Sequence, residues 1–252
     1  MDTKLATVTS SDVRLSTMVE GHFTIEGLED LGQRDVILPR WSVLQPTSKK
    51  EGTPGFFYRN LDAVTQPALD VAILTVKPGR LLWSGELNET IPECRSNDAI
   101  TGSKERDSEG RYGECATCWF NLWCNPDLRR QLDAGQLVKV CNFGYNLLMA
   151  DTADGSLALL GAMGTSVRPI KVLVSQFAQK RRPPFSAIIH IATELQRNER
   201  GKFYVLAPKI VKWLSAEETI PWREMYLNLK GQAIKEVEEV VPGDEPMDEP
   251  TF

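Results

Sequence analysis

Short apolar runs separated by polar turns dominate the middle of the chain. Asp154-Gly155 between two of these runs is a strong hairpin signal, and the polar turn 196–201 separates two more. An earlier β-rich run continues after Pro78-Gly79 around a turn or bulge. The pattern predicts five strands, at 70–76 with its continuation 81–83, at 137–150, at 156–162, at 185–195 and at 202–211.

Between the third and fourth predicted strands the apolar period changes to that of a helix. Thr165-Ser166 is suited to cap its N-terminus, and Pro183-Pro184 ends it after the basic cluster 180–182. The positions at helical spacing are Val167, Ile170, Val174 and Phe177. A last amphipathic helix is predicted to begin at Pro221, with one apolar face made of Trp222, Met225, Tyr226 and Leu229.

The order strand, long insertion, strand, strand, helix, strand, strand is that of a five-stranded OB barrel. We therefore expect a mainly β fold with helices, an OB-like barrel with an inserted module. The expected organisation is an N-terminal arm at 1–34, the barrel domain at 35–214 with an insertion at 94–141, a C-terminal helix at 215–235 and a tail at 236–252. No P-loop or internal repeat is present, so neither an NTPase nor a solenoid is supported.

Charge divides the chain into two unequal parts. The 252 residues include 29 Lys and Arg against 34 Asp and Glu, and the pI is near 5.3. Seven of the acidic residues lie in 236–252, which has no Lys or Arg, so residues 1–235 carry a net charge of about +2. A near-neutral body with local basic patches permits binding to a phosphate backbone.

The acidic segment 236–252 also contains three prolines and ends in Phe252. Its composition predicts a disordered tail with one hydrophobic residue at the tip, because so acidic a run cannot bury enough apolar surface to fold. Such a tail can serve as a solubilising segment or as a partner-binding one. The candidate partner-binding residues are Asp248, Glu249 and Phe252.

No apolar run is long enough to cross a membrane, and residues 1–16 lack the features of a signal peptide. We therefore expect the protein to stay in the cytoplasm of the cell that makes it. The five cysteines then lie in a reducing compartment, where clustering within residues 94–141 favours a metal site over disulfides.

Cys115-Ala-Thr-Cys118 is a C-x2-C hook, which places two thiolates within reach of one Zn²⁺. Cys94 upstream is the third candidate ligand, and either Cys141 or Cys124 is the fourth. We favour Cys141 because it lies in an apolar, strand-like run. Four sulfur ligands leave no open position for water, so the predicted zinc is structural. A pair of buried free thiols and a redox-active hook are the alternatives.

Single-stranded nucleic acid is held by cations along its phosphates and by aromatic rings on which bases stack. The best platform is the 137–150 strand, where alternation places Lys139, Cys141, Phe143 and Tyr145 on one face. Around the hook, Trp119, Phe120 and Trp123 are more suited to a small core than to stacking. The candidate DNA-binding residues are Arg59, Arg80, Trp83, Arg106, Arg111, Tyr112, Lys139, Phe143, Tyr145, Lys202 and Tyr204, with Phe57 and Tyr58 as further candidates.

Two features of the chain resemble known proteins. The acidic tail ending in Phe252 resembles those of single-stranded DNA-binding proteins from bacteria and their phages. The stretch 94–177 resembles phage replication and DNA-binding proteins in Cys94-Arg-Ser-Asn-Asp, Gly113-Glu-Cys-Ala-Thr-Cys, a further Cys in a strand, and Gly164-Thr-Ser before a helix. In that pattern Pro usually follows the hook, where this chain has Trp119. The resemblance implies a phage-type single-stranded DNA-binding protein with zinc, and favours Cys141 as the fourth ligand.

The leading hypothesis is a non-catalytic protein that coats single-stranded DNA in replication or recombination and recruits partner enzymes through its tail. A zinc-containing transcription or replication factor, which binds protein partners or duplex DNA, is the alternative. A nuclease that uses Asp98 or Asp107 with Mg²⁺ is less favoured, because neither carboxylate belongs to a paired motif.

Overall fold

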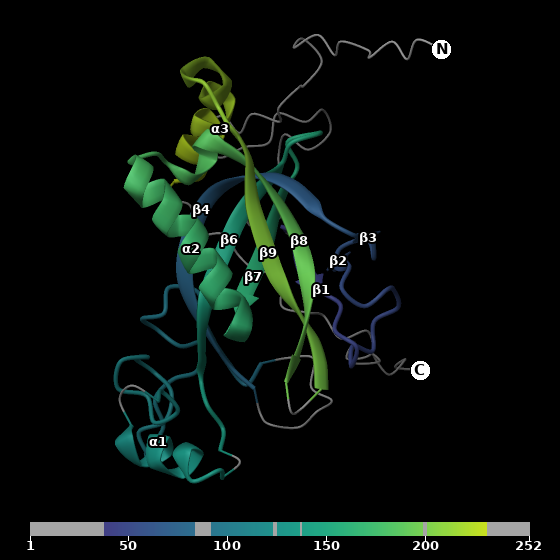
Figure 1. Cartoon of the computed structure of the whole chain (residues 1–252). Coiled ribbons are helices and arrows are strands. Elements are labelled where there is room, and N and C mark those ends of the chain that lie inside the picture. Colours follow the sequence, from purple (N-terminus) through teal and green to yellow (C-terminus); the bar gives the residue numbers. More distant parts are fainter. Residues whose placement is uncertain (1–37, 84–91, 123–124, 137, 199–200, 231–252) are drawn as a thin grey trace, which may run out of the picture.

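The computed structural model describes residues 38–83, 92–122, 125–136, 138–198 and 201–230, and the fold is mixed α+β with one large, curled sheet (Figure 1). The strands are β1 (Arg40–Val43), β2 (Phe57–Arg59), β3 (Thr65–Gln66), β4 (Leu69–Leu82), β5 (Cys94–Ser96), β6 (Asn142–Asp151), β7 (Leu157–Met163), β8 (Ala187–Asn198) and β9 (Gly201–Trp213). The helices are α1 (Pro126–Asp133), α2 (Val167–Lys180) and α3 (Ala216–Leu229), with short 3-10 turns η2 (Gly164–Ser166) and η3 (Pro184–Ser186). The predicted arm 1–34 and tail 236–252 lie outside the described residues.

All five predicted strands are present, as β4, β6, β7, β8 and β9. The second one begins later than predicted, at Asn142, so Lys139 and Cys141 precede the strand and do not lie on it. The β6–β7 hairpin turns at the predicted Asp154-Gly155, where Gly155 has φ of +74°, a conformation that glycine adopts without strain. In the second hairpin, β8 and β9 extend further into the predicted polar turn, and their pairing reaches Asn198 and Gly201.

Strand β4 is one continuous element that organises the sheet. Its first residues pair with β8, nearly its whole length pairs with β6, and its end pairs with β5. The register shifts between Ile73 and Thr75, an irregularity that bends a strand. In Figure 1 the end of the β8–β9 hairpin and the segment around α1 both lie at the lower end of the curved sheet.

The sheet order is β3-β2-β1-β7-β6-β4-β8-β9, with β5 added beside β4. Among the described strands β7 does not pair with β9, so strand pairing does not close the predicted five-stranded barrel, and the sheet is curled and open between these strands. Instead β1, which was not among the predicted strands, pairs in parallel with β7.

The gap between β1 and β9 is bridged by a side chain. The amide of Gln45 accepts from the backbone N–H of Tyr204 at 2.8 Å and donates to its carbonyl at 3.0 Å. Gln45 therefore substitutes for a strand neighbour at this point.

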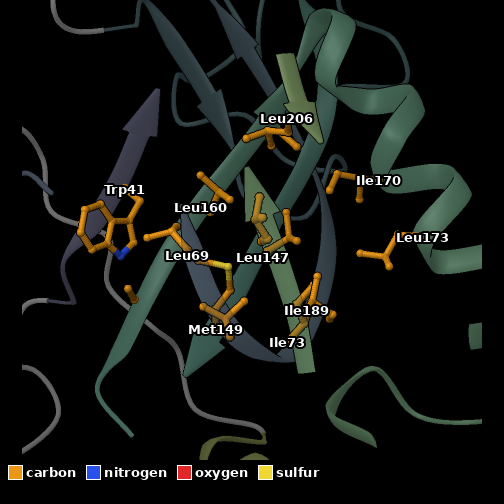
Figure 2. Close-up of a cluster of buried hydrophobic side chains, with 14 of the residues drawn as sticks. Trp41, Leu69, Ile73, Leu147, Met149, Leu160, Ile170, Leu173, Ile189 and Leu206 are labelled. Atoms are coloured by element: carbon orange, nitrogen blue, oxygen red, sulfur yellow. The ribbon is translucent and has the colours of Figure 1, made fainter. Parts of the chain in front are cut away.

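Helix α2 covers one face of the sheet (Figure 1). Its Ile170, Leu173 and Phe177 pack on a cluster of fully buried side chains from β4, β6, β7, β8 and β9, including Ile73, Leu147, Met149, Leu160, Ile189 and Leu206 (Figure 2). Each such side chain contributes about 1.5–3 kcal/mol through the hydrophobic effect. The helix lies where it was predicted, but the Ser166 hydroxyl does not cap it and accepts from the Leu206 N–H instead.

Helix α3 packs against the other face of the sheet from α2. Trp222, Met225, Tyr226 and Leu229 contact a second cluster that includes Leu74, Leu148 and Phe185. The predicted apolar face is therefore correct, but the helix begins at Ala216 rather than at Pro221. A capping box between Ser215 and Glu218 starts the helix one turn earlier and places Pro221 inside it.

Among the described residues, no helix combines the length and apolar character needed to cross a membrane.

Candidate functional site

Strand register brings Cys94 and Cys141 to the two sides of one β4 residue. On β5, Cys94 pairs with Leu82, and on β6, Asn142 pairs with Leu81. Because β4 and β6 are antiparallel, the residue before Asn142 lies opposite the residue after Leu81. Cys141 therefore lies opposite Leu82. Cross-strand neighbours share a sheet face, so both thiols flank the buried Leu82 side chain.

The hook is held against this edge by backbone and amide hydrogen bonds. The Cys141 N–H donates to the Phe120 carbonyl at 2.9 Å, two residues beyond Cys118. The buried Asn121 donates from Nδ2 to the Cys115 carbonyl at 2.7 Å. These contacts fix the turn Cys115–Cys118 relative to Cys141, which directly precedes β6.

Helix α1 follows the hook and was not predicted from the sequence. The side chain of Asn125 caps it by accepting from the N–H groups of Asp127 and Leu128, and Pro126 occupies its first position. Asn followed by Pro and Asp is a helix start. That pattern was available in the sequence, but the segment has too few apolar positions to show helical periodicity.

A second tight turn approaches Cys94. The Gly102 N–H donates to the Gly113 carbonyl at 2.8 Å, and a Cβ at Gly102 would lie 3.0 Å from the Cys94 Sγ and 3.1 Å from that carbonyl. The Ser103 hydroxyl lies 3.9 Å from the same sulfur. A side chain at position 102 would crowd the Cys94 sulfur, so the glycine keeps this space open.

Cys94, Cys115, Cys118 and Cys141 line one cavity, and all four are free thiols. Among the described residues, no group of three or more His, Cys, Asp and Glu side chains is close enough together to hold a metal ion. The donor set and the space at Gly102 fit a zinc ion. Cys124 lies outside the described residues, and His190 is on β8, in an ion pair with Asp70.

Arg80 is the cation at this cavity with the clearest electrostatic effect. Burial raises the pKa of the Cys141 thiol to about 11 and also raises that of Cys115, while the positive charge of Arg80 acts in the opposite direction on both. Buried thiols without a metal are neutral at pH 7. Their conversion to thiolates therefore requires a bound cation.

A polar cluster centred on Glu93 ties the walls of the cavity together. The Glu93 carboxylate accepts from Tyr112 and from Lys139, whose Nζ lies 2.5 Å from Oε2. Burial alone would raise the pKa of Glu93, but the two hydrogen bonds outweigh it and lower the pKa. Burial and the Glu93 charge raise the pKa of Tyr112 to about 12. Two predicted DNA-binding residues thus have their polar ends engaged within the protein.

Aromatic rings and cations surround the cavity. The Phe143 ring has the Arg80 guanidinium 5.7 Å and the Lys171 Nζ 5.8 Å from its centroid. Trp83 and Trp119, each one residue beyond a cavity-lining residue, are 42% and 47% exposed. The prediction that Trp119 belongs to a small core is therefore wrong. Sequence reasoning did not select Lys171, because it is the fold that brings α2 over β6.

Tyr145 and Tyr112 use their rings for packing. Tyr145 contacts the core cluster beneath α2 and meets Phe143 edge-on at 5.3 Å, and Tyr112 lies against Phe120 at 5.6 Å. Phe57 is fully buried, so its predicted role in DNA contact is wrong. Tyr58 is half-buried beneath Lys50, whose Nζ is 4.8 Å from the ring centroid.

Three predicted cations are paired with neighbours. Arg59 forms an ion pair with Asp62 and lies over Trp41, Arg111 forms ion pairs with Asp107 and Glu109, and Arg106 lies 3.5 Å from the Thr117 hydroxyl. Such exposed pairs are weak and can exchange partners.

The carboxylates considered for Mg²⁺ both stabilise turns. Asp98 accepts from Ser96 and from the N–H groups of Ile100 and Thr101, and Asp107 accepts from those of Glu109 and Arg111.

The β8–β9 hairpin carries two cations directly opposite each other, Arg197 and Lys202, followed by the pair Leu195 and Tyr204. Alternation places these four side chains on the face that buries Ile189, Ile191 and Leu206 further along. Like charges opposite each other repel, so an anion between them is favourable. Tyr204 also packs on Gly55, where a Cβ would lie 2.5 Å from the ring.

Asp248, Glu249 and Phe252, the predicted partner-binding residues, lie outside the described part of the chain. Comparison of the chain with protein-family models, with curated proteins and with solved structures gives no match.

Proposed function

We propose that this protein is a non-catalytic single-stranded DNA-binding protein of the phage type, acting in the cytoplasm in DNA replication or recombination. A structural zinc held by Cys94, Cys115, Cys118 and Cys141 stabilises the module that presents its aromatic residues, and the acidic tail recruits partner enzymes.

The observation that carries the proposal is the set of rings around the cysteine cavity. Trp83 and Trp119 are exposed indoles, and the Phe143 ring has the cations of Arg80 and Lys171 at 5.7 Å and 5.8 Å from its centroid. Exposed rings beside cations suit stacked bases joined by phosphates, and each stacked base is worth about 1–3 kcal/mol. A duplex hides these base faces, so the arrangement favours single strands.

The β8–β9 hairpin supplies a second contact. In Figure 1 the described end of this hairpin and the segment around α1 both lie in the lower part of the molecule, and Arg197 and Lys202 are directly opposite each other in the hairpin. A strand whose bases stack near the cavity would then meet further cations with its phosphates.

An OB-like barrel would explain why the cysteine cavity and the β8–β9 hairpin both carry candidate DNA contacts. It is supported by the order β7-β6-β4-β8-β9 and by the helix between β7 and β8, and the insertion between β4 and β6 and the β8–β9 loop are the binding loops of that fold. The described strands differ from an OB barrel in how the sheet closes. An OB barrel would pair β7 with β9, whereas here β1 pairs with β7 and the Gln45 amide hydrogen-bonds to β9.

Fluorescence titration with mixed-sequence oligonucleotides, single- and double-stranded, at two salt concentrations tests the function. We expect tight, salt-sensitive binding that prefers single strands. Equal binding to both forms would instead support a duplex-binding factor, and absence of binding would overturn the proposal.

Variants locate the contact. Trp83→Leu and Trp119→Leu should each weaken single-strand affinity by about 5- to 100-fold, as loss of one stacked base predicts. Ile100→Ala, which changes an exposed apolar side chain of the same module, is the matched control and should leave affinity unchanged. Lys202→Gln should lower the slope of log affinity against log salt by about 1.

A further inference from the structure

Arg80 has a buried donor that nothing in the described part of the chain accepts. Its Nε is fully shielded from solvent and has no hydrogen-bond partner there. A buried, unsatisfied N–H is costly and uncommon, so its presence at a cavity points to an absent acceptor. The surrounding cavity is lined by the four cysteine sulfurs.

Two polar side chains of the cavity wall use donors elsewhere. The Ser96 hydroxyl donates to Asp98, and Asn121 donates to the Cys115 carbonyl. The cysteine sulfurs of the same cavity are acceptors that the Arg80 Nε–H can use. As neutral thiols they accept weakly, but as metal-bound thiolates they accept strongly.

Arg80 also touches the aromatic residue most closely associated with the cavity. In the β4–β6 register it stands directly opposite Phe143, and its guanidinium lies 5.7 Å from the ring centroid. The strand alternation that points Arg80 at the cavity also points Phe143 to the same face. One side chain thus contacts both the cavity and the ring.

We infer that Arg80 is a positioning residue that couples the two sites: its Nε–H donates to a cysteine sulfur when zinc is bound, which holds the Phe143 ring in place for a stacked base. The inference rests on the proposed function. Zinc with four thiolates carries a net charge of −2, so a guanidinium at the cavity stabilises the loaded centre. Zinc occupancy then controls single-strand affinity without zinc contacting the nucleic acid.

The first test is made on the zinc-loaded full-length protein without nucleic acid. Zinc release to a metal-sensitive dye is compared for wild type, Arg80→Gln and Arg80→Lys, with circular dichroism to confirm that each is folded. Loss of a residue that supports metal ligands typically weakens binding about 10- to 100-fold, and we expect faster release of that order from Arg80→Gln. Arg80→Lys retains the charge but not the Nε–H, so its release should lie between the two.

The second test measures affinity for an oligo-dT strand in zinc-loaded and chelator-treated protein. Wild type should bind more weakly after zinc removal, whereas Arg80→Gln should bind equally weakly in both states. Lys171→Gln is the matched control, because Lys171 also lies over Phe143 but does not line the cavity. It should weaken binding while preserving the zinc dependence.

The outcomes separate this inference from the proposed function. Wild-type release rates in Arg80→Gln, or an unchanged zinc dependence of its binding, would overturn the role of Arg80 alone. A wild type that holds no zinc would overturn both the proposed zinc site and this inference. If wild type holds zinc but binds no single strand, the proposed function and the coupling both fail, and only the stabilising role at the cavity survives.

Discussion

At the scale of single residues, three local features place the four cysteines of the cavity. Strand pairing places Cys94 beside Leu82, a backbone bond to Phe120 places Cys141, and a tight turn places the hook. These contacts are made within the protein itself, and together they bring the four sulfurs to one cavity. Preorganisation of this kind lowers the entropic cost of metal binding.

The fourth ligand can be identified by paired substitutions. Cys141→Ser should lower zinc content from one ion per chain to near zero, because a three-sulfur site loses an anionic ligand. Cys124→Ser should retain the full content. Metal analysis of the purified variants is the measurement, and full zinc in Cys141→Ser with loss in Cys124→Ser would reverse the assignment.

At the scale of elements, local turn chemistry defines the β6–β7 hairpin. The Asp154 carboxylate accepts from the Ser156 N–H at 2.8 Å. This hydrogen bond, which outweighs a smaller opposing effect of burial, lowers the pKa of Asp154, and the positive charge of Arg59 lowers it further. The ionised carboxylate is therefore the form that stabilises the turn.

The sign of the pH dependence follows from that shift. Because the folded-state pKa lies below the unfolded value of about 3.9, the stabilisation is present above the unfolded pKa and is lost as pH falls through the folded one. Asp154→Asn keeps the geometry of the turn but not the charge. Urea unfolding should show wild type more stable at pH 7, by less than about 1 kcal/mol, and the difference should shrink as the pH falls below the unfolded pKa of about 3.9. A difference that stays constant as the pH falls would mean that charge is not its source.

At the scale of the whole molecule, the acidic segment 236–252 and the remainder of the chain have opposite net charge. Opposite charges on one chain attract, and the attraction is strongest at low salt. We therefore expect the tail to compete with nucleic acid for the cations that bind phosphate.

Deleting residues 236–252 should raise single-strand affinity, most strongly below about 0.1 M salt, where screening is weak. Oligonucleotide titrations of the full-length and shortened proteins measure the change. A full-length variant with the seven tail carboxylates replaced by their amides is the control, and it should match the deletion if charge is responsible. Unchanged affinity in both would leave the tail with its recruiting role alone.

Periodicity in the sequence was sufficient to predict β4, β6, β7, β8, β9 and α2, because each carries a long apolar pattern bounded by turn residues. It missed α1 and the short strands β1, β2, β3 and β5, because short elements bury few side chains and their positions depend on neighbours. It also placed the start of α3 at Pro221, where the capping box at Ser215 determines the start. Exposure of Trp119 and burial of Phe57 depend on packing between distant segments, which local pattern does not encode.

The sequence by itself determined the set of cysteines, the acidic terminus and the alternation that orders the strands, since these are properties of residue type and spacing along the chain. Only the tertiary structure decided which side chains meet. The bend of β4 and its register with β5 and β6 bring Arg80, Phe143 and the thiols of Cys94 and Cys141 to one face. Such long-range contacts are set by packing of the whole sheet and not by local preference.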